Sequence, residues 1–308
     1  MHDNLDKEYQ QYRRSWIELP EKFIIRDFPM HLDIETTSCC NLKCTFCDKL
    51  PLLKKNQRGY IDLDLYKKII DEGAEHKLWG VKLSYRGEPL LHKDICKMVH
   101  YAKKNGVLDV YFNTNGMLLS EEVSNELIDA GLNRISISIE GVDAASFEQK
   151  RIGAKFDVIK KNIEILLNLR SKKNVNYPKI RIQTLHVSGF NLEQYRNYWV
   201  KFCDEVAAVD YKDESKRKSG LVYDWACPQL WQRMTVEWDG TILPCNNDDL
   251  RMLSPGNVKD KTIHRCWHDD KINKIRHLHK QGLSHKIEDC NGCPWRTAQI
   301  NKLIRKGN

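Results

Sequence analysis

The strongest chemical signal in this sequence is a group of three cysteines in the stretch TTSCCNLKCTFCDKLP, residues 36–51. Cys40, Cys44 and Cys47 are spaced as C-x3-C-x2-C, and no histidine follows them in this stretch. A structural zinc site requires four tetrahedral ligands, and no fourth ligand lies close by. Three thiolates can instead bind three irons of a 4Fe–4S cluster and leave the fourth iron open. We therefore predict an iron–sulfur cluster with one open iron at this loop.

A second group of cysteines lies near the C-terminus. Its four members are spaced as C-x17-C, then a gap of 44 residues, then C-x2-C. Four thiolates suit either a tetrahedral zinc ion or a fully ligated 4Fe–4S cluster, and taken in isolation they favour zinc. The predicted ligands of this second metal site are Cys227, Cys245, Cys290 and Cys293.

The chain has 11 cysteines, and the other four are scattered: Cys39, Cys96, Cys203 and Cys266. We expect these to be small buried apolar side chains. The polar N-terminus does not resemble a secretory signal, and no apolar run reaches the ~18 residues that a membrane span needs. A cytoplasmic protein with reduced thiols is expected, and cysteine clusters in that compartment serve metal binding or redox chemistry.

The composition is that of a globular protein, with 41% hydrophobic and 30% charged residues. Lysine and arginine exceed the acidic residues by 8, and the basic residues are dense only at residues 212–220, which we expect to be a solvated linker. No helix-turn-helix or RNA-binding signature is present, so nucleic acid is not an expected partner.

Short apolar runs alternate with amphipathic helical patterns between residues 30 and 211. This alternation is typical of parallel βαβ units, and about six of them are present, two fewer than in a complete eight-stranded barrel. The fold class predicted is therefore α/β, a partial (β/α)6 TIM-like barrel. The expected strands are HLDIET (31–36), VKLSY (81–85), LDVYFNTNG (108–116), RISISIEG (134–141), KIRIQTLHV (179–187) and AAVDY (207–211).

The pattern changes after residue 220. Residues 234–245 read as two short strands joined by a tight turn at Asp239-Gly240, and one helix is expected from Thr262 to near Gly282. A small β-hairpin and helix domain carrying the second cysteine group is therefore predicted. The predicted domains are an N-terminal extension (1–29), the barrel (30–211), a charged linker (212–220), the auxiliary domain (221–300) and a tail (301–308).

A C-x3-C-x-Phe-C motif after the first strand of a βα barrel resembles the signature of the radical S-adenosylmethionine (SAM) superfamily. The resemblance covers roughly residues 30–300. It implies that the open iron binds the amino and carboxylate groups of SAM, and that cluster reduction releases a 5′-deoxyadenosyl radical that abstracts hydrogen from a substrate. Phe46 matches the aromatic residue that packs near the adenine in that superfamily.

The tetrapeptide RGEP, residues 86–89, stands where the superfamily has a GGEP-like motif. The resemblance implies that Gly87 lets the backbone approach SAM closely. It also implies that the carboxylate of Glu88 accepts a hydrogen bond from the ammonium group of SAM. Arg86 replaces the usual first glycine, and both a buried ion pair and a substrate contact remain open for it. Further SAM-binding residues implied by the resemblance, each with a structural role as the alternative, are Asn113, Asn115, Ser136, Ser138 and Arg151.

Behind such a barrel, the C-terminal cysteines resemble those of SPASM/twitch extensions, which hold auxiliary iron–sulfur clusters. Four cysteines match the shorter twitch form found in dehydrogenases of 2-deoxy-scyllo-inosamine. The resemblance implies SAM and two 4Fe–4S clusters, one SAM-binding and one auxiliary, with a flavodoxin- or ferredoxin-type electron donor.

A cluster held by four protein thiolates has no open iron, so its chemistry is one-electron exchange. An alcohol that has lost its carbinol hydrogen atom becomes a ketone when it also loses an electron and the O–H proton. We therefore predict a radical SAM oxidoreductase that dehydrogenates a hydroxyl group of a sugar, cyclitol or related metabolite. Asp33, Glu35 and Arg86 are the candidate catalytic residues, with a structural role inside the barrel as the alternative for each.

Two other functions remain open. The same layout of clusters serves radical SAM enzymes that modify peptides, as epimerases or as thioether and crosslink formers. An epimerase needs a hydrogen-atom donor, for which Cys203 and Cys266 are the candidates. A more remote alternative is a zinc-binding protein without enzymatic activity.

Overall fold

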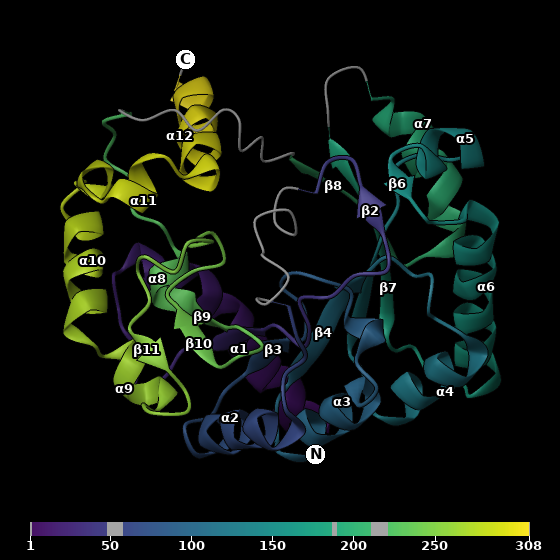
Figure 1. Cartoon of the computed structure of the whole chain (residues 1–308), viewed down its shortest axis with the longest axis horizontal. Helices are drawn as coiled ribbons and strands as arrows, with labels where there is room; N and C mark the ends of the chain where they lie inside the picture. The colour runs from purple at the N-terminus through teal and green to yellow at the C-terminus, as the bar shows by residue number, and fades with distance from the viewer. Residues whose placement is uncertain (1, 48–57, 187–189, 211–220, 308) are drawn as a thin grey trace.

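Figure 1 shows a computed structural model of the chain, which describes residues 2–47, 58–186, 190–210 and 221–307. Its main sheet has the strand order β11-β10-β9-β1-β3-β4-β5-β7-β8. These strands are β1 (His31–Ile34), β3 (Gly80–Lys82), β4 (Asp109–Thr114), β5 (Arg134–Ser138), β7 (Lys179–His186), β8 (Glu205–Asp210), β9 (Arg233–Val236), β10 (Thr241–Leu243) and β11 (Gly256–Asn257). The linker predicted at residues 212–220 lies outside the described residues.

The six strands from β1 to β8 in this order are parallel, and helices cover their outer side (Figure 1). The α/β class and the partial barrel predicted from the sequence are thus confirmed. The helical segments of this part are α2 (Leu63–Glu75), η3 (Pro89–Leu91), α3 (Ile95–Lys104), α4 (Glu121–Asp129), α5 (Ala144–Glu148), α6 (Phe156–Lys172), α7 (Leu192–Trp199) and η4 (Val200–Phe202).

The barrel helices begin at side-chain caps and bury one apolar face. The carboxylate of Asp62 accepts hydrogen bonds from the N–H groups of Asp64 and Leu65 at the start of α2. The hydroxyl of Ser120 accepts a hydrogen bond from Val123 N–H at the start of α4. Such caps satisfy amides that have no partner within the helix. The buried faces pack on apolar strand residues such as Leu32, Val110 and Ile135, all fully buried, so the core lies between sheet and helices.

A C-terminal hairpin extends the barrel sheet. The expected hairpin is present as β9 and β10, which pair antiparallel, and Gly240 takes the positive φ (92°) that the turn requires. Beyond the prediction, β9 also pairs in parallel with β1, from His31 opposite Arg233 to Ile34 opposite Val236. The C-terminal part is therefore joined to the barrel by backbone hydrogen bonds.

The helices of the C-terminal part differ from the prediction in one place. The expected single helix from Thr262 to Gly282 is wrong, because the chain forms two helices and Asp269 caps the second through Lys271 N–H. Helix α12 also includes most of the predicted tail. The helical segments here are α8 (Gln229–Gln232), α9 (Ile263–Trp267), α10 (Asp270–Lys280), η6 (Ser284–Lys286), α11 (Glu288–Asn291) and α12 (Pro294–Gly307).

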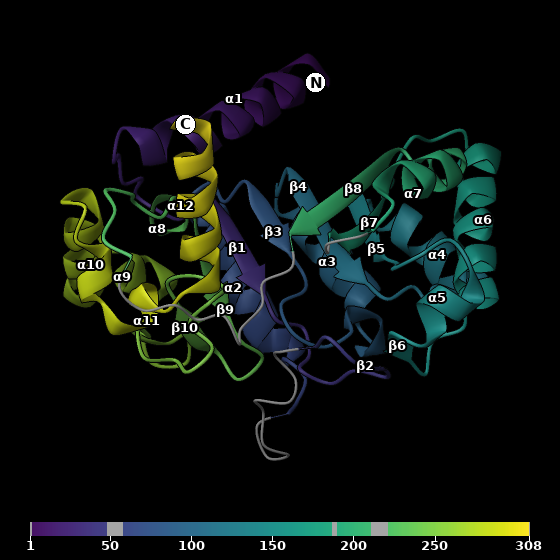
Figure 2. The same cartoon turned by 90° about the horizontal axis from the view of Figure 1, so that it is seen from above.

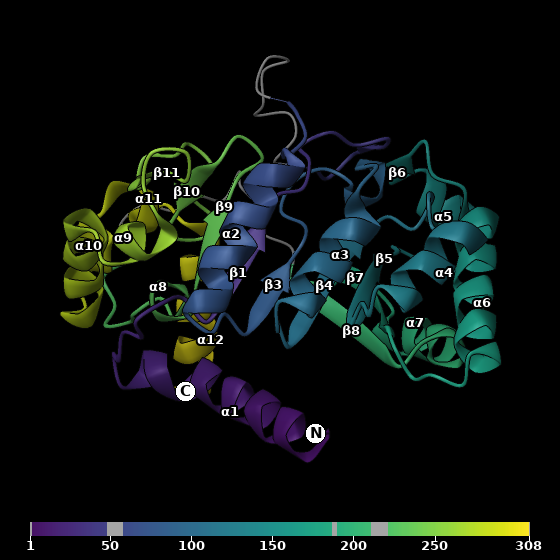
Figure 3. The same ribbon diagram turned by 90° about the horizontal axis from the view of Figure 1, so that it is seen from below.

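The N-terminal extension forms helix α1 (His2–Glu21), which lies across one end of the molecule (Figures 2 and 3). It packs on the amino ends of β1 and β9. Tyr12 Oη lies 3.1 Å from His31 Nδ1, and Gln232 Nε2 donates to the carbonyl of Trp16 at 2.7 Å. Among the described helices, none is both long and apolar enough to cross a membrane.

Candidate functional site

The first cysteine group lies on the loop that leaves the carboxyl end of β1. Cys44 belongs to the two-residue strand β2 (Lys43–Cys44), which pairs antiparallel with β6 (Arg151–Ile152), and a turn brings Cys47 N–H to the carbonyl of Cys44 at 3.2 Å. Leu42 N–H donates to Cys40 Sγ at 3.4 Å. Burial raises the pKa of the Cys44 thiol to about 11, and the neighbouring sulfurs of Cys40 and Cys47 add to this shift. The three thiols therefore share one site, and we call this segment the cluster loop (residues 36–47).

Arg151 supplies positive charge to the cluster loop. Its guanidinium is bound by the carboxylate of Glu140 (Nη2 to Oε1, 2.8 Å) and its Nη1 lies 3.8 Å from Cys44 Sγ. The guanidinium carbon also lies 5.2 Å from the centre of the Phe46 ring. Arg151 favours the thiolate form of Cys44, which is the form that binds metal. Its predicted contact with SAM stays a prediction.

The RGEP loop packs directly on the cluster loop. Glu88 N–H donates to the carbonyl of Cys39 at 2.7 Å. Gly87 has φ +69°, and a Cβ built on it would lie 2.4 Å from the carbonyl oxygen of Thr37 and 2.5 Å from that of Cys39. A glycine is therefore required here for two reasons, the left-handed backbone and the contact between two main chains.

Replacing Gly87 by alanine should disturb the cluster loop beyond the cost of the backbone conformation. Gly106 is a matched control, because its φ is +85° and nothing lies within 4 Å of a Cβ built there. Both substitutions should lower the free energy of unfolding by about 1–2 kcal/mol for the left-handed conformation. Only Gly87→Ala should add a further loss and reduce the iron content after anaerobic reconstitution. Equal stability and full iron content in both variants would contradict this assignment.

The carboxylate of Glu88 ties the RGEP loop to the end of β4. It accepts from Thr114 Oγ1 at 2.6 Å, from Asn115 N–H at 2.7 Å and from Leu90 N–H at 3.1 Å. An ionised carboxylate has about four acceptor positions, and contacts from the described residues fill three of them. Asn115 in turn donates from Nδ2 to Asn41 Oδ1 at 2.8 Å. Sequence reasoning missed Asn41, whose only signal was its place between two of the cysteines.

The two serines predicted to bind SAM, Ser136 and Ser138, lie two residues apart on β5 and therefore share one face of the strand. Ser136 is buried, and its hydroxyl has no hydrogen-bond partner among the described residues. The Ser138 hydroxyl accepts from Gln183 Nε2 at 3.2 Å. Asn113 is opposite Ser136 on β4, and its backbone N–H donates to Ser84 Oγ. Buried polar groups are rarely left unpaired, so the Ser136 hydroxyl is the best placed of these groups to bind a ligand.

Arg86 lies in a buried network of charges at the carboxyl ends of β1, β3 and β9. Its Nε and Nη2 donate to the carboxylate of Glu35 at 2.6 and 2.7 Å, and its Nη2 lies 2.5 Å from Glu237 Oε1. Arg251 Nε lies 2.5 Å from the other oxygen of Glu237. Of the two roles open for Arg86, the structure shows the ion pair. Glu237 was missed because only the pairing of β9 with β1 brings it here.

Asp33 lies apart from this network. Its carboxylate is 3.3 Å from His31 Nε2 and accepts from Arg233 Nη1 at 3.2 Å. The Arg233 guanidinium helps to hold the pKa of the buried Asp33 carboxyl well below its usual range, against the effect of burial. Asp33 therefore lies within an ion pair between β1 and β9.

The four cysteines of the second group all line one small cavity. We call it the C-terminal cysteine cavity. Cys227 precedes α8, Cys245 follows β10, Cys290 lies in α11 and Cys293 immediately precedes α12. Burial raises the pKa of the Cys290 thiol, and the three other sulfurs raise it further. Segments that are distant in the chain, from Cys227 to Cys293, thus bring four thiols together, as a metal or cluster requires.

The scattered cysteines are placed differently from one another. Cys266 is completely buried, as predicted, but Cys39, Cys96 and Cys203 are only half-buried, so the prediction for these three is wrong. Cys203 Sγ donates to the carbonyl of Trp199 at 3.2 Å, and it lies just before β8, at the amino edge of the sheet. That edge is opposite the one that carries the cluster loop.

Two family models match this chain. The radical SAM superfamily model matches residues 34–187, and the model of an iron–sulfur cluster-binding domain, SPASM, matches residues 227–294. Among curated proteins, the chain is 33% identical over 141 residues to a probable GTP 3′,8-cyclase of Methanococcus maripaludis, covering 46% of this chain and 45% of that protein. A GTP 3′,8-cyclase of Clostridium botulinum is 29% identical, covering 58% of this chain and 56% of that protein. The chain spans about half the length of these relatives.

Solved structures share the fold over most of the chain. BtrN in complex with AdoMet and 2-DOIA has a TM-score of 0.60 and 20% identity, covering 87% of this chain and 94% of that chain. Streptococcus suis SuiB bound to the precursor peptide SuiA has a TM-score of 0.67 and 16% identity, covering 88% and 72%. The family matches imply SAM, a 4Fe–4S cluster in the barrel and iron–sulfur binding in the C-terminal part. This chain therefore belongs to the radical SAM superfamily and carries a C-terminal SPASM domain.

Proposed function

We propose that this protein is a radical SAM dehydrogenase that oxidises a hydroxyl group of a sugar, cyclitol or related small metabolite. The observation that carries the proposal is the convergence of Cys227, Cys245, Cys290 and Cys293 on one cavity. Four protein thiolates saturate a 4Fe–4S cluster, so the centre held there has no open iron for a substrate and is suited to accept an electron.

The residues of the barrel fit the SAM-binding cluster. Cys40, Cys44 and Cys47 would hold three of its irons, and the buried hydroxyl of Ser136, which has no hydrogen-bond partner among the described residues, would contact SAM. When bound, SAM and this cluster supply a 5′-deoxyadenosyl radical. The chain contributes the main-chain contact of Gly87 with the cluster loop and the network of Glu88, which together keep the cluster loop in place.

In the proposed reaction the substrate loses a hydrogen atom, a proton and one electron. Its carbinol carbon gives a hydrogen atom to the 5′-deoxyadenosyl radical, which becomes 5′-deoxyadenosine. The substrate would next lose its O–H proton to a base or to water. A cluster held by Cys227, Cys245, Cys290 and Cys293 would supply the one-electron oxidant, so that the substrate becomes a ketone. The oxidised form of a flavodoxin- or ferredoxin-type protein would remove that electron, and the reduced form would supply the electron that starts the next turnover.

His279 should raise the reduction potential of the C-terminal centre. Cys227 N–H donates to His279 Nδ1 at 3.1 Å, so the ring proton is on Nε2, which lies 3.4 Å from Cys290 Sγ. An N–H···S bond stabilises the additional negative charge of the reduced centre. Replacing His279 by leucine should lower the potential by ~40 mV, the equivalent of a hydrogen bond of about 1 kcal/mol in a one-electron couple. Redox titration followed by electron paramagnetic resonance measures this, and His277→Leu, at an exposed histidine on α10, is the control.

Peptide epimerisation is less well supported by the structure. Of the two candidate hydrogen donors, Cys203 lies at the amino edge of the barrel and Cys266 is completely buried in α9. Support for GTP cyclisation comes from sequence relatives that this chain matches over about half their length. The likeness in fold to BtrN extends over 94% of the BtrN chain.

The test compares three classes of substrate on one preparation. Anaerobically reconstituted protein is incubated with SAM and dithionite and with a panel of cyclitols and aminocyclitols, a set of short peptides, or GTP. The proposal predicts that a cyclitol or sugar increases 5′-deoxyadenosine formation and yields a product lighter by two hydrogen atoms. Turnover of GTP or of a peptide, with no oxidised cyclitol or sugar, would reject it.

A further inference from the structure

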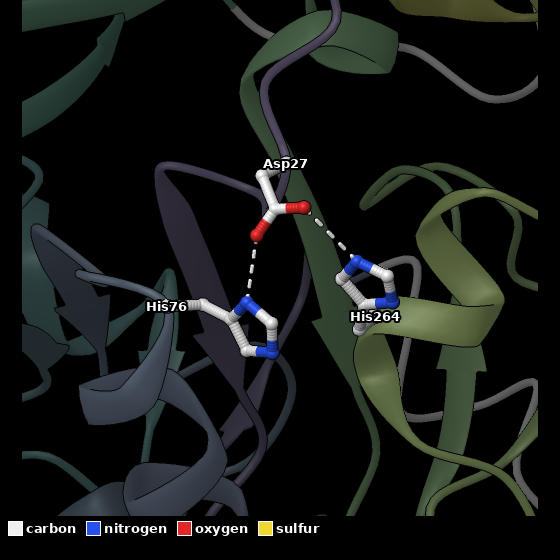
Figure 4. A group of neighbouring side chains, drawn as sticks. All are labelled: Asp27, His76 and His264. Carbon is white, nitrogen blue, oxygen red and sulfur yellow. Dashed lines mark hydrogen bonds and ion pairs between the residues drawn. The ribbon is translucent and has the colours of Figure 1, made fainter.

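Asp27, His76 and His264 converge on the outside of the molecule, away from both cysteine groups. Asp27 lies in the segment between α1 and β1, His76 at the end of α2, and His264 in α9 of the SPASM domain. Figure 4 shows one oxygen of the Asp27 carboxylate directed at each imidazole ring. Its Oδ2 lies 2.7 Å from His76 Nδ1 and its Oδ1 lies 3.1 Å from His264 Nε2.

The spacing of these atoms fits a tetrahedral metal ion. One ligand atom from each residue can be chosen so that all three lie within 4.8 Å of one another. Ligand bonds of 2.0–2.1 Å in a tetrahedral zinc site place ligand atoms about 3.3 Å apart. The two short distances from Asp27 are hydrogen-bond distances to different oxygens of one carboxylate, 2.7 Å from Oδ2 to His76 and 3.1 Å from Oδ1 to His264. Binding of one ion by all three residues therefore requires a side-chain rotation that replaces these hydrogen bonds.

The surrounding rings hold the two histidines in place. The His76 ring is stacked between Phe28 and His264, at 5.0 and 4.8 Å between ring centres. His268, four residues after His264, donates from Nε2 to the carbonyl oxygen of Asp27 at 2.8 Å. These contacts keep the side chains close together before an ion binds, which limits the conformational freedom lost on binding. The Asp27 side chain is 71% exposed, so an ion can reach it from solvent.

We propose that Asp27, His76 and His264 form a binding site for Zn²⁺, with water as the fourth ligand. Two imidazoles and one carboxylate form a donor set that zinc prefers, and magnesium and calcium prefer oxygen ligands. The ligands come from the segment that enters β1, from a barrel helix and from the SPASM domain. The bound ion fastens these three parts together on the outside of the barrel.

The test measures zinc in protein whose cysteines are already occupied by iron and sulfide. Reconstituted wild type is stripped with EDTA, dialysed against a low concentration of ZnCl₂ and analysed for zinc and iron by mass spectrometry. His76→Ala/His264→Ala removes two ligands, Asp27→Asn removes the anionic one, and His277→Ala removes an exposed histidine elsewhere. Equal iron content in all four proteins shows that the fold and both clusters are intact.

The expected result is one zinc per chain in the wild type and in His277→Ala, none in the double variant, and at least tenfold weaker binding in Asp27→Asn. The midpoint of thermal unfolding should rise with zinc only in the proteins that bind it. Equal zinc in the wild type and the double variant, or no zinc in the wild type, would overturn the proposal. Loss of zinc in His277→Ala would also overturn it, because binding would then be a property of surface histidines in general.

Discussion

Replacement of Cys40, Cys44 and Cys47 by alanine is expected to abolish reductive cleavage of SAM. The structure brings the three thiols to one site beside Arg151 through β2, β6 and the turn at Cys47, so we expect them to be the protein ligands of the barrel cluster. Without them, no iron is held where SAM can bind it. The variant should form no 5′-deoxyadenosine with dithionite and SAM, and it should lose about four irons per chain.

Cys39→Ala is the matched control for this experiment. Cys39 is adjacent in sequence and contacts the RGEP loop through its backbone carbonyl, which the substitution leaves unchanged. This variant should keep its iron and its SAM cleavage. Formation of 5′-deoxyadenosine by the triple variant, or equal loss of activity in Cys39→Ala, would contradict the assignment of the three ligands.

The parts of the fold that were predictable from the sequence are those encoded by local patterns. Alternating apolar runs and amphipathic helices indicated the six parallel strands, because strand and helix differ in hydrophobic period. The hairpin was predictable from Asp239-Gly240. Both cysteine groups could be recognised in the sequence as candidate metal sites, because metal binding constrains the spacing of ligands that are neighbours in the chain.

The parts that were not predictable depend on contacts between distant segments. The pairing of β9 with β1 joins residues about 200 apart, through a strand of only four residues. Glu237 reaches Arg86 only because of this pairing, so the sequence left the role of Arg86 open. The same holds for Asp27 and His264, which no local pattern connects. The break before α10 was predictable in principle, since Asp269 is a good helix cap, but the apolar periodicity continued across it.

The second prediction with a large expected effect concerns the cysteines that line the C-terminal cysteine cavity. Replacing Cys290 and Cys293 by alanine removes two of four ligands and leaves the cluster loop unchanged, because the two sites have no ligand in common. Hydrogen abstraction from the substrate should therefore continue, and oxidation of the resulting radical should fail for want of an electron acceptor. Iron should fall by about half, from two clusters to one. Retention of SAM cleavage by the variant shows that the barrel remains folded.

The most direct test of the dehydrogenase mechanism follows the two halves of the reaction with one label. The substrate identified in the assay above is deuterated at its carbinol carbon and given to the wild type and to Cys290→Ala/Cys293→Ala. The wild type should form deuterated 5′-deoxyadenosine and ketone in equal amounts. The variant should still form deuterated 5′-deoxyadenosine, with little or no ketone. Ketone formed at the wild-type rate by a variant verified to lack the second cluster would contradict the account, because the substrate's electron would then not pass through the C-terminal centre.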